Sequence, residues 1–316
     1  MRPLARLLPA IAAAVALWPG AASAQLTLFP APQGDGRELS VYSSLDDDLA
    51  APLVAAFQRI HPGVAVRYEN LLTTELHDRI VAETQAGGAT ADFAFSSAMD
   101  LQVKLANDGF ARPVQTPHTP GWPDWANWRD TAYALTFEPA VFAYHKPSFA
   151  DHPPPATRAD LMQWMAEHPD EAQGRIGTYD VARSGVGYLF LARDQELYPG
   201  IWSVVQAMGR AGVRQFPTSA ELLEQIADGR LAVGYNLLGS YASDWARRHP
   251  DLGVILPRDF TVVVSRVALV PAAARQPGLG ADFLAFLMSP EGQGLLSRTL
   301  RLSAVSLEVA GQPGPA

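Results

Sequence analysis

The sequence predicts an α/β fold made of two lobes. Short strand-like segments alternate with helix-like segments along most of the chain, a pattern typical of sheets that are covered by helices on both faces. The chain has 316 residues, of which 48% are hydrophobic. A chain of this size is near the point at which one hydrophobic core gives way to two, so we expect two lobes.

Residues 1–24 have the composition of a secretory signal peptide. Arg2 and Arg6 form a positive start, residues 7–18 are almost all apolar, and Ala22-Ser23-Ala24 is a small-residue cleavage sequence. The apolar run has about twelve residues, whereas a helix that spans a membrane needs roughly twenty. We therefore expect cleavage after residue 24 and a mature protein that is soluble in a bacterial periplasm.

The composition argues against several other locations and partners. The chain has no cysteine, so it offers neither a disulfide nor a thiol for lipid attachment, and we do not expect a lipoprotein. The net charge is −8, and it becomes −10 when the two arginines of the signal peptide are removed. We do not expect such an acidic protein to bind nucleic acid or anionic lipid, and we expect it to be a monomer.

Three strand–helix repeats follow the signal peptide and predict a parallel sheet. The expected strands cover 38–42, 64–68 and 91–95, and the expected helices cover 49–60, 75–84 and 98–107. The pattern changes in the Pro- and Trp-rich loop at 118–128. A strand-like run at 132–144 follows this loop, and we expect it to be interrupted at Glu138-Pro139.

The triple proline at 153–155 is a stiff connector that leads into the second lobe. Strand and helix alternation resumes after it. The expected helices are 158–168, 187–194, 198–208, 219–227 and 240–249, and the expected strands are 176–179 and 231–235.

Two later strand segments are expected to return the chain to the first lobe. These are 254–256 and 261–271, and they precede helices at 279–287 and 292–297. We therefore expect residues 25–140 together with 255–316 to form the first lobe. Residues 141–254 are expected to form the second.

Small hydroxyl residues recur where a strand delivers the chain to a helix. These positions are Ser43-Ser44, Ser96-Ser97, Ser184-Gly185 and Ser240-Tyr241. In an open α/β sheet, ligands bind at the carboxyl ends of the strands, where helix N-termini present unpaired N–H groups. Serine is also a preferred N-cap, so each pair taken alone is explained by capping. Four pairs in equivalent positions predict a binding site for an anion.

The segment 183–188 contains the largest set of candidate contacts. Gly185 and Gly187 let backbone N–H groups approach a ligand closely, and Ser184 adds a hydroxyl. Arg183 offers a planar guanidinium group to a carboxylate or a phosphate.

Arg266 and the tyrosines are further candidates. Arg266 lies in the expected strand 261–271 and is either a second cation of the site or a solvated residue on a sheet edge. The tyrosines at 144, 188, 235 and 241 are candidate hydroxyl donors, although tyrosines in such strands often serve packing.

No catalytic or metal-binding motif stands out in the sequence. Ser184 lacks the preceding glycine of a nucleophile elbow, and no two histidines have the spacing of a zinc-binding helix. Without cysteine, binding through oxygen atoms is the remaining option for a metal. We therefore expect no catalytic residues, no cofactor and no metal site.

Five groups of residues match the pattern of one known family. They are Val41-Tyr42-Ser43-Ser44-Leu45, Ala91-Asp92-Phe93-Ala94-Phe95-Ser96-Ser97, Ser184-Gly185-Val186-Gly187-Tyr188, Gly234-Tyr235-Asn236 with Gly239-Ser240-Tyr241, and Asp282-Phe283-Leu284 with Ser289-Pro290-Glu291-Gly292-Gln293. Over nearly the whole mature chain, the sequence resembles the extracellular solute-binding proteins of ABC transporters. It is similar to the branch that contains ferric-iron, phosphoglycerate and hexose-phosphate binding proteins.

The resemblance implies a two-lobed periplasmic binding protein fold with type II topology. Two segments would cross between the lobes, and hinge closure would trap a solute in the cleft. The implied site residues of the first lobe are Ser43, Ser44, Ser96 and Ser97. Those of the second lobe are Ser184, Gly185, Tyr188, Asn236, Ser240 and Tyr241.

Two kinds of solute stay open at this point. A cleft with serine, glycine and arginine suits a small anionic organic solute, phosphorylated or carboxylated, that accepts several hydrogen bonds. The iron-binding members have two consecutive tyrosines where this chain has Ser240-Tyr241, so this chain has half of the phenolate pair that ferric iron needs. We expect the anionic solute, with ferric iron as the alternative.

The expected partner is the set of membrane permease subunits of an ABC transporter. Some members of the phosphoglycerate branch serve a membrane sensor histidine kinase instead, and the sequence does not separate the two. A secreted hydrolase would need a nucleophile with a base in reach, and the sequence contains no such arrangement.

Overall fold

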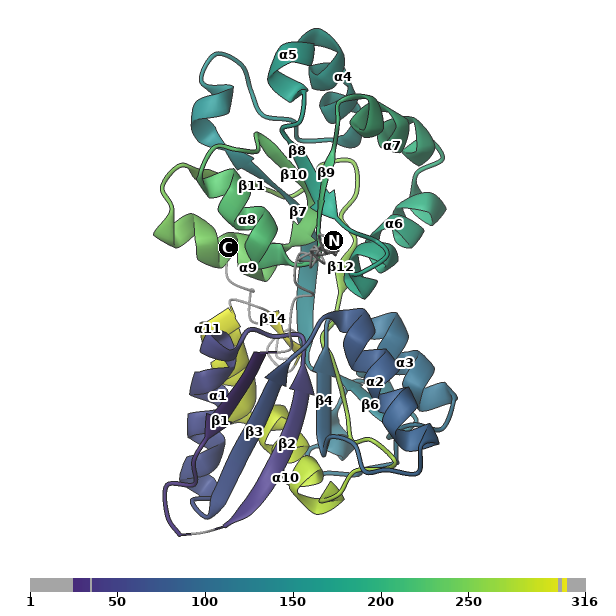
Figure 1. Ribbon diagram of the computed structural model, residues 1–316, viewed down its shortest axis with the longest axis vertical. Coiled ribbons are helices and arrows are strands. Elements are labelled where there is room, and N and C mark those ends of the chain that lie inside the picture. The colour runs from purple at the N-terminus through teal and green to yellow at the C-terminus, as the bar shows by residue number, and fades with distance from the viewer. Residues whose placement is uncertain (1–24, 35, 301–302, 306–316) are drawn as a thin grey trace, which may run out of the picture.

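The structure, a computed structural model, describes residues 25–34, 36–300 and 303–305. The expected signal peptide, residues 1–24, lies outside the described residues. The chain forms two α/β lobes, one above the other in Figure 1, and a long strand passes between them. Within the described ranges, no helix has both the length and the apolar character needed to span a membrane.

The first lobe is built on a sheet of seven strands. In spatial order these are β1 (Gln25–Phe29), β3 (Val64–Asn70), β2 (Arg37–Ser43), β4 (Phe93–Ser96), β13 (Val267–Leu269), β6 (Ala132–Ala134) and β5 (Asn127–Trp128). One face is covered by α1 (Asp47–Ile60), α10 (Pro277–Met288) and α11 (Pro290–Leu300), and the other by α2 (Thr73–Gln85) and α3 (Met99–Asn107), as Figure 1 shows.

Side chains alternate along the strands and build a separate core on each face of this sheet. Val41 of β2 belongs to the core that contains Phe57 of α1 and Phe283 of α10, whose ring centroids lie 5.0 Å apart. The next residue, Tyr42, belongs to the core that contains Leu76 of α2. Because successive side chains of a strand point to opposite faces, one strand serves both cores.

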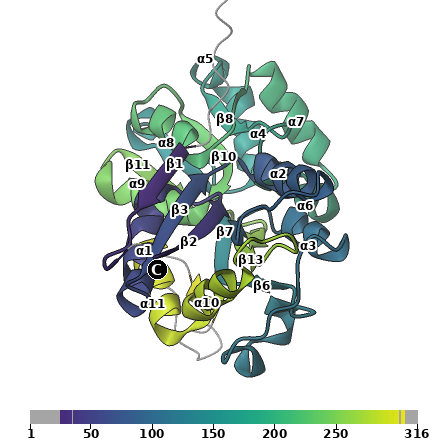
Figure 2. The same cartoon turned by 60° about the horizontal axis from the view of Figure 1, so that its bottom comes forward.

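The second lobe is built in the same way. Its strands, in spatial order, are β11 (Leu252–Ile255), β7 (Thr136–His145), β10 (Val233–Leu238), β8 (Ile176–Tyr179) and β9 (Arg214–Phe216). Its helices are α4 (Arg158–Glu167), α5 (Pro169–Ala172), α6 (Gly185–Leu197), α7 (Ile201–Arg210), α8 (Ser219–Ala227) and α9 (Gly239–Arg248). Helices α4, α5 and α7 lie on one side of the sheet, and α8 and α9 lie on the other (Figures 1 and 2).

Strand β7 links the two lobes. Its first residues pair with the short strands β12 (Val263–Val264) and β14 (Ser303–Ala304), and its last residues pair with β10 and β11. The chain returns from β11 through β12 to β13, which pairs with β4 and β6 in the first sheet. Two extended segments therefore cross between the lobes, as a hinge requires.

The sheets differ from the sequence expectation in strand direction and in the position of one break. Both sheets are mixed and not parallel throughout, because β1 and β13 in the first sheet and β7 in the second run antiparallel to their neighbours. β13 enters the first sheet after the chain has returned from the other lobe, so no strand–helix–strand crossover sets its direction. The run 132–144 breaks at Leu135, and Glu138 and Pro139 continue β7. Pro139 fits there because the neighbouring Ala140 donates its N–H to the carbonyl of Val262.

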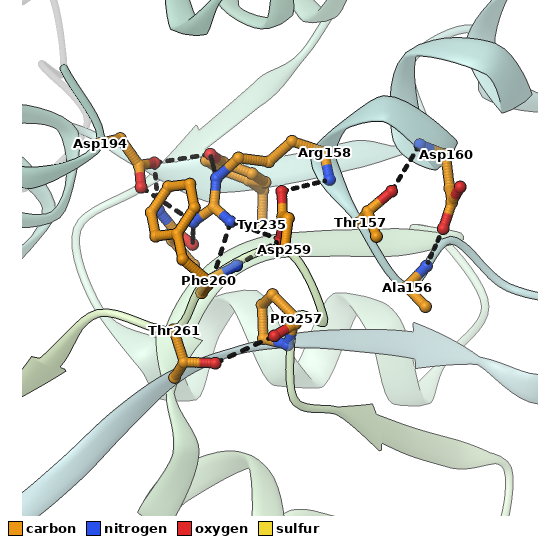
Figure 3. Close-up of polar contacts among 11 residues, drawn as sticks. Ala156, Thr157, Arg158, Asp160, Asp194, Tyr235, Pro257, Asp259, Phe260 and Thr261 are labelled. Carbon is orange, nitrogen blue, oxygen red and sulfur yellow. Dashed lines mark hydrogen bonds and ion pairs between the residues drawn. The ribbon is translucent and has the colours of Figure 1, made fainter. Parts of the chain in front are cut away.

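A fully buried arginine holds the second lobe together (Figure 3). Arg158, the first residue of α4, donates to Asp194 at 2.8 Å, to Asp259 at 3.0 Å and to the hydroxyl of Tyr235 at 2.9 Å. Its Cζ lies 3.6 Å from the ring centroid of Phe260. These contacts join α4, α6 and β10 to the segment through which the chain leaves the lobe.

We predict that Arg158→Met lowers the free energy of unfolding by about 3–5 kcal/mol, because it leaves the buried carboxylate of Asp194 without its cation. Urea unfolding followed by tryptophan fluorescence measures this change. Arg193→Ala is the control, because Arg193 lies in α6 next to Asp194 and pairs with Glu196, but the side chains of this pair are exposed. The control should change stability by no more than about 0.5 kcal/mol. Equal effects of the two substitutions would contradict the prediction.

Candidate functional site

A cavity of about 160 Å³ lies between the two lobes. Its lining residues from the first lobe are Gln25, Ser44, Asp46, Asn70, Leu71, Leu72, Thr73, Glu75 and Ser97. Those from the second lobe are Tyr179, Ser184, Val186, Pro217, Thr218, Ser219, Ala220, Leu238 and Tyr241. Most of the polar side chains are hydroxyls, and no basic side chain is among the lining residues that the structure describes.

Six helices begin at the wall of this cavity. The lining residues next to the helix starts are Asp46 (α1), Leu72 (α2), Ser97 (α3), Ser184 (α6), Thr218 (α8) and Leu238 (α9). The first four N–H groups of a helix have no partner inside the helix, and the helix dipole gives this end a partial positive charge. Helix dipoles from both lobes therefore place partial positive charge at the cavity wall, beside the carboxyl groups of Asp46 and Glu75.

In the two serine pairs of the first lobe, the second serine faces the cavity. Ser44 and Ser97 line it, with their hydroxyl oxygens 3.5 Å apart, and the N–H of Ser97 donates to Ser44 Oγ at 3.1 Å. Ser43 instead donates to the carbonyl of Phe95, and Ser96 Oγ accepts from the N–H of Ala98. The strand ends thus place one serine of each pair in the site and use the other to fix the turn.

An ion pair lies beneath the cavity, between the two crossing segments. Glu138 of β7 and Arg266, which lies between β12 and β13, are both fully buried, and Arg266 Nε lies 2.9 Å from Glu138 Oε1. Ser240 donates to Glu138 Oε2 at 2.8 Å. Arg266 Nη1 lies 3.4 Å from Ser44 Oγ, and its Cζ lies 5.6 Å from the ring centroid of Tyr241.

Arg266 is not among the lining residues, but it contacts two of them, Ser44 and Tyr241. Its Nη2 is buried and has no hydrogen-bond acceptor among the described residues. The alternative of a solvated edge position, which the sequence left open, is wrong for Arg266, because it is fully buried.

Burial shifts the pKa values of one carboxyl group and two phenols that line the cavity. Burial raises the pKa of Asp46, although the hydrogen bond from Asn70 opposes this. Burial also raises the pKa of Tyr179 to about 12 and that of Tyr241 well above its ordinary value. Tyr241 Oη accepts from the N–H of Asp46 at 3.2 Å. Both phenols are hydrogen-bond donors at neutral pH.

The lobes touch directly at one edge of the cavity. The N–H of Gly185 donates to Thr73 Oγ1 at 2.7 Å, and Thr74 Oγ1 donates to the carbonyl of Arg183 at 2.8 Å. A Cβ on Gly185 would lie 2.8 Å from Leu101 Cδ1 and 3.2 Å from Thr73 Oγ1. The glycine is therefore needed for the close approach of α6 to the first lobe.

The remaining candidates lie outside the cavity wall. The side chain of Arg183 is exposed, and Tyr188 is 58% exposed. Asn236 is buried in the Arg158 network, where it donates to Asp194 at 2.6 Å, and its φ of 54° marks a break in the pairing of β10 with β7. Ser240 does not line the cavity, and its hydroxyl donates to Glu138.

Sequence reasoning missed several lining residues. Among them are Asn70, Thr73, Tyr179, Thr218 and Ser219. The start of α8 has a recognisable sequence pattern, because Thr218 Oγ1 accepts from the N–H of Glu221 and Thr-x-x-Glu is the pattern of a capping box. Asn70 and Tyr179 carry no such pattern, since only the pairing of the strands brings their ends to this edge.

Many solved structures share the fold, and three of them illustrate the range of similarity. The substrate-binding protein of an ABC transporter from Agrobacterium tumefaciens is 56% identical over 94% of this chain and 86% of that chain, with a TM-score of 0.89. AfuA from Actinobacillus pleuropneumoniae, solved with fructose-6-phosphate, is 17% identical over 86% and 85%, with a TM-score of 0.74. Iron-bound HitA from Pseudomonas aeruginosa is 16% identical over 85% of each chain, with a TM-score of 0.68. The last two likenesses show the fold alone.

The sequence itself matches one protein family. No curated protein matches the chain. The model of the family described as bacterial extracellular solute-binding protein matches residues 52–314, which is most of the chain. The protein therefore belongs to the bacterial extracellular solute-binding proteins and is a substrate-binding component of an ABC transporter, not an enzyme.

Proposed function

We propose that this protein captures a small anionic organic solute, phosphorylated or carboxylated, in the cavity between its lobes and delivers it to the permease of its transporter. The observation that carries the proposal is the convergence of six helix N-termini on one cavity. Helix N-termini bind anions because their N–H groups point at the ligand and their dipoles favour negative charge.

The hydroxyl side chains suit the same kind of solute. Ser44, Ser97 and Ser184 line the cavity from both lobes, so one anionic group can accept hydrogen bonds from each. Hydrogen bonds to a charged group contribute about 1.5–3 kcal/mol each. Three or four of them, less the entropy of association, are enough for the roughly micromolar affinity of a transport receptor. Asp46 and Asn70 would accept hydrogen bonds from hydroxyls elsewhere on the solute.

Ferric iron is the less favoured solute. Ferric iron is bound through phenolate oxygens, and the two tyrosines of the described cavity wall, Tyr179 and Tyr241, are not adjacent in the sequence. Ser240, which occupies the position of the first tyrosine of the pair, donates its hydroxyl to Glu138. The chain therefore lacks the adjacent pair of phenolates.

We further propose that the mature protein acts in the periplasm as a soluble monomer, without a lipid anchor, after removal of residues 1–24. Within this proposal, a membrane sensor kinase is the alternative recipient of the closed, solute-loaded form. We also propose that residues 25–140 and 255–316 form the first lobe and that residues 141–254 form the second.

A thermal-shift panel tests the nature of the solute. Organophosphates and di- and tricarboxylates are compared with ferric citrate and with a cationic polyamine. A matching anion at one hundred times its dissociation constant should stabilise the protein by about 2.7 kcal/mol, which raises the melting temperature by about 5 °C. A shift with ferric citrate accompanied by a visible charge-transfer colour would favour iron instead, and a shift with the polyamine alone would overturn the anionic proposal.

Ser184→Ala should weaken binding of the matching anion by about tenfold or more, because it removes one hydrogen bond to a charged group. Thr157→Ala is the matched control. Ser184 and Thr157 both accept from a backbone N–H at the start of a helix, but Thr157 caps α4 away from the cavity. Each substitution should cost about 1 kcal/mol of stability. Calorimetry that shows equal affinities for the two variants would remove Ser184 from the site.

Gly185→Ala should hold the lobes slightly apart, because the added methyl group meets Leu101 and Thr73 of the first lobe. Loss of the hydrogen bond between Gly185 and Thr73 costs about 1 kcal/mol, or about fivefold in solute affinity. Gly209→Ala in α7 is the control, since a Cβ there meets no atom within 4 Å. Small-angle scattering and calorimetry on both variants measure the effect. Unchanged closure in Gly185→Ala would show that this contact does not limit the closed form.

A further inference from the structure

Two histidines and a glutamate meet on the second lobe, far from the residues that line the interlobe cavity. His152 lies in the connector before the triple proline, His168 joins α4 to α5, and Glu171 lies in α5. Their side chains are 18%, 31% and 44% exposed. They are thus close to the surface and accessible to a small ion.

The positions of the three side chains fit the ligand set of a metal ion. His152 Nε2 lies 3.1 Å from Glu171 Oε2, and His168 Nδ1 lies 3.2 Å from Glu171 Oε1. One ligand atom from each residue lies within 4.8 Å of the other two. In tetrahedral zinc sites the bonds are about 2.0–2.2 Å long, which separates the ligand atoms by about 3.3 Å. Only small side-chain movements separate the observed arrangement from this one.

The charge around the cluster favours a cation. A cavity of about 530 Å³ beside the cluster is lined by both histidines, by Asp160 and Glu167, and by one basic residue, Arg258. This cavity gives water and ions access to the histidines.

We propose that His152, His168 and Glu171 form a zinc-binding site, with water in the remaining coordination position. Two imidazoles and one carboxylate are a ligand set that zinc uses in proteins when one position stays open. The bound ion would join the connector at residues 150–157 to the turn between α4 and α5. The site is independent of the interlobe cavity.

Isothermal titration of the EDTA-treated, dialysed protein with zinc chloride tests the proposal. The expected result is one zinc ion per chain, with binding at least about tenfold weaker, or about 1.4 kcal/mol, in His152→Ala, His168→Ala and Glu171→Gln. His118→Ala, which changes a histidine of the first lobe, should bind zinc as the unsubstituted protein does. Cobalt substitution gives a second readout, because tetrahedral cobalt absorbs strongly in the visible range.

Two outcomes would overturn the zinc site. If the unsubstituted protein binds no zinc, the three side chains form only hydrogen bonds and ion pairs at the surface. If zinc binds but none of the three variants weakens it, the ion is held elsewhere. Circular dichroism of each variant confirms that a loss of binding is not a loss of folding.

Discussion

The ion pair between Glu138 and Arg266 is the constraint on which the arrangement of the two lobes depends. Each residue lies on one of the two segments that cross between the lobes, and both are fully buried. Removing two charges from water costs several kcal/mol for each ion, so the pair is tolerated only with good geometry and further hydrogen bonds. Thr136 and Ser240 supply hydrogen bonds to Glu138. The pair thereby fixes the crossing strands against each other and sets the floor of the cavity.

The properties of the cavity follow from this fixed floor. Arg266 lies behind Ser44 and against the ring of Tyr241, so residues of both lobes take their positions from one buried cation. Around them, strands from the two sheets end at the same edge, and each delivers the chain to a helix start. Backbone N–H groups and hydroxyls therefore make up the wall, and a negatively charged solute can be held without a lysine or arginine in direct contact. The Arg158 network attaches the return segment to the second lobe through Asp259 and Phe260.

Much of the fold could be predicted from local patterns. Val41 and Tyr42 show why, because alternation along a strand buried on both faces follows directly from the pleat. The serine pairs marked the correct strand ends, yet Ser43 and Ser96 hold the turns while Ser44 and Ser97 face the cavity. The antiparallel direction of β13 was missed, because it depends on a return from the other lobe. The sequence predicted the break at Glu138-Pro139, because proline has no N–H to donate to a neighbouring strand. The strand instead breaks at Leu135, and the N–H of Ala140, the residue after Pro139, supplies the hydrogen bond to Val262.

The sequence by itself determined the α/β character, the presence of two lobes and the serine turns, since these rest on hydrophobic periodicity and on the backbone preferences of single residues. The tertiary structure decided which of those residues share one cavity. Asn236 and Ser240 were drawn into buried networks, Arg183 and Tyr188 face solvent, and Thr73 and Thr218 joined the wall. The physical reason is that contacts between residues far apart in the sequence depend on how two sheets and two crossing strands pack. No local pattern encodes that packing.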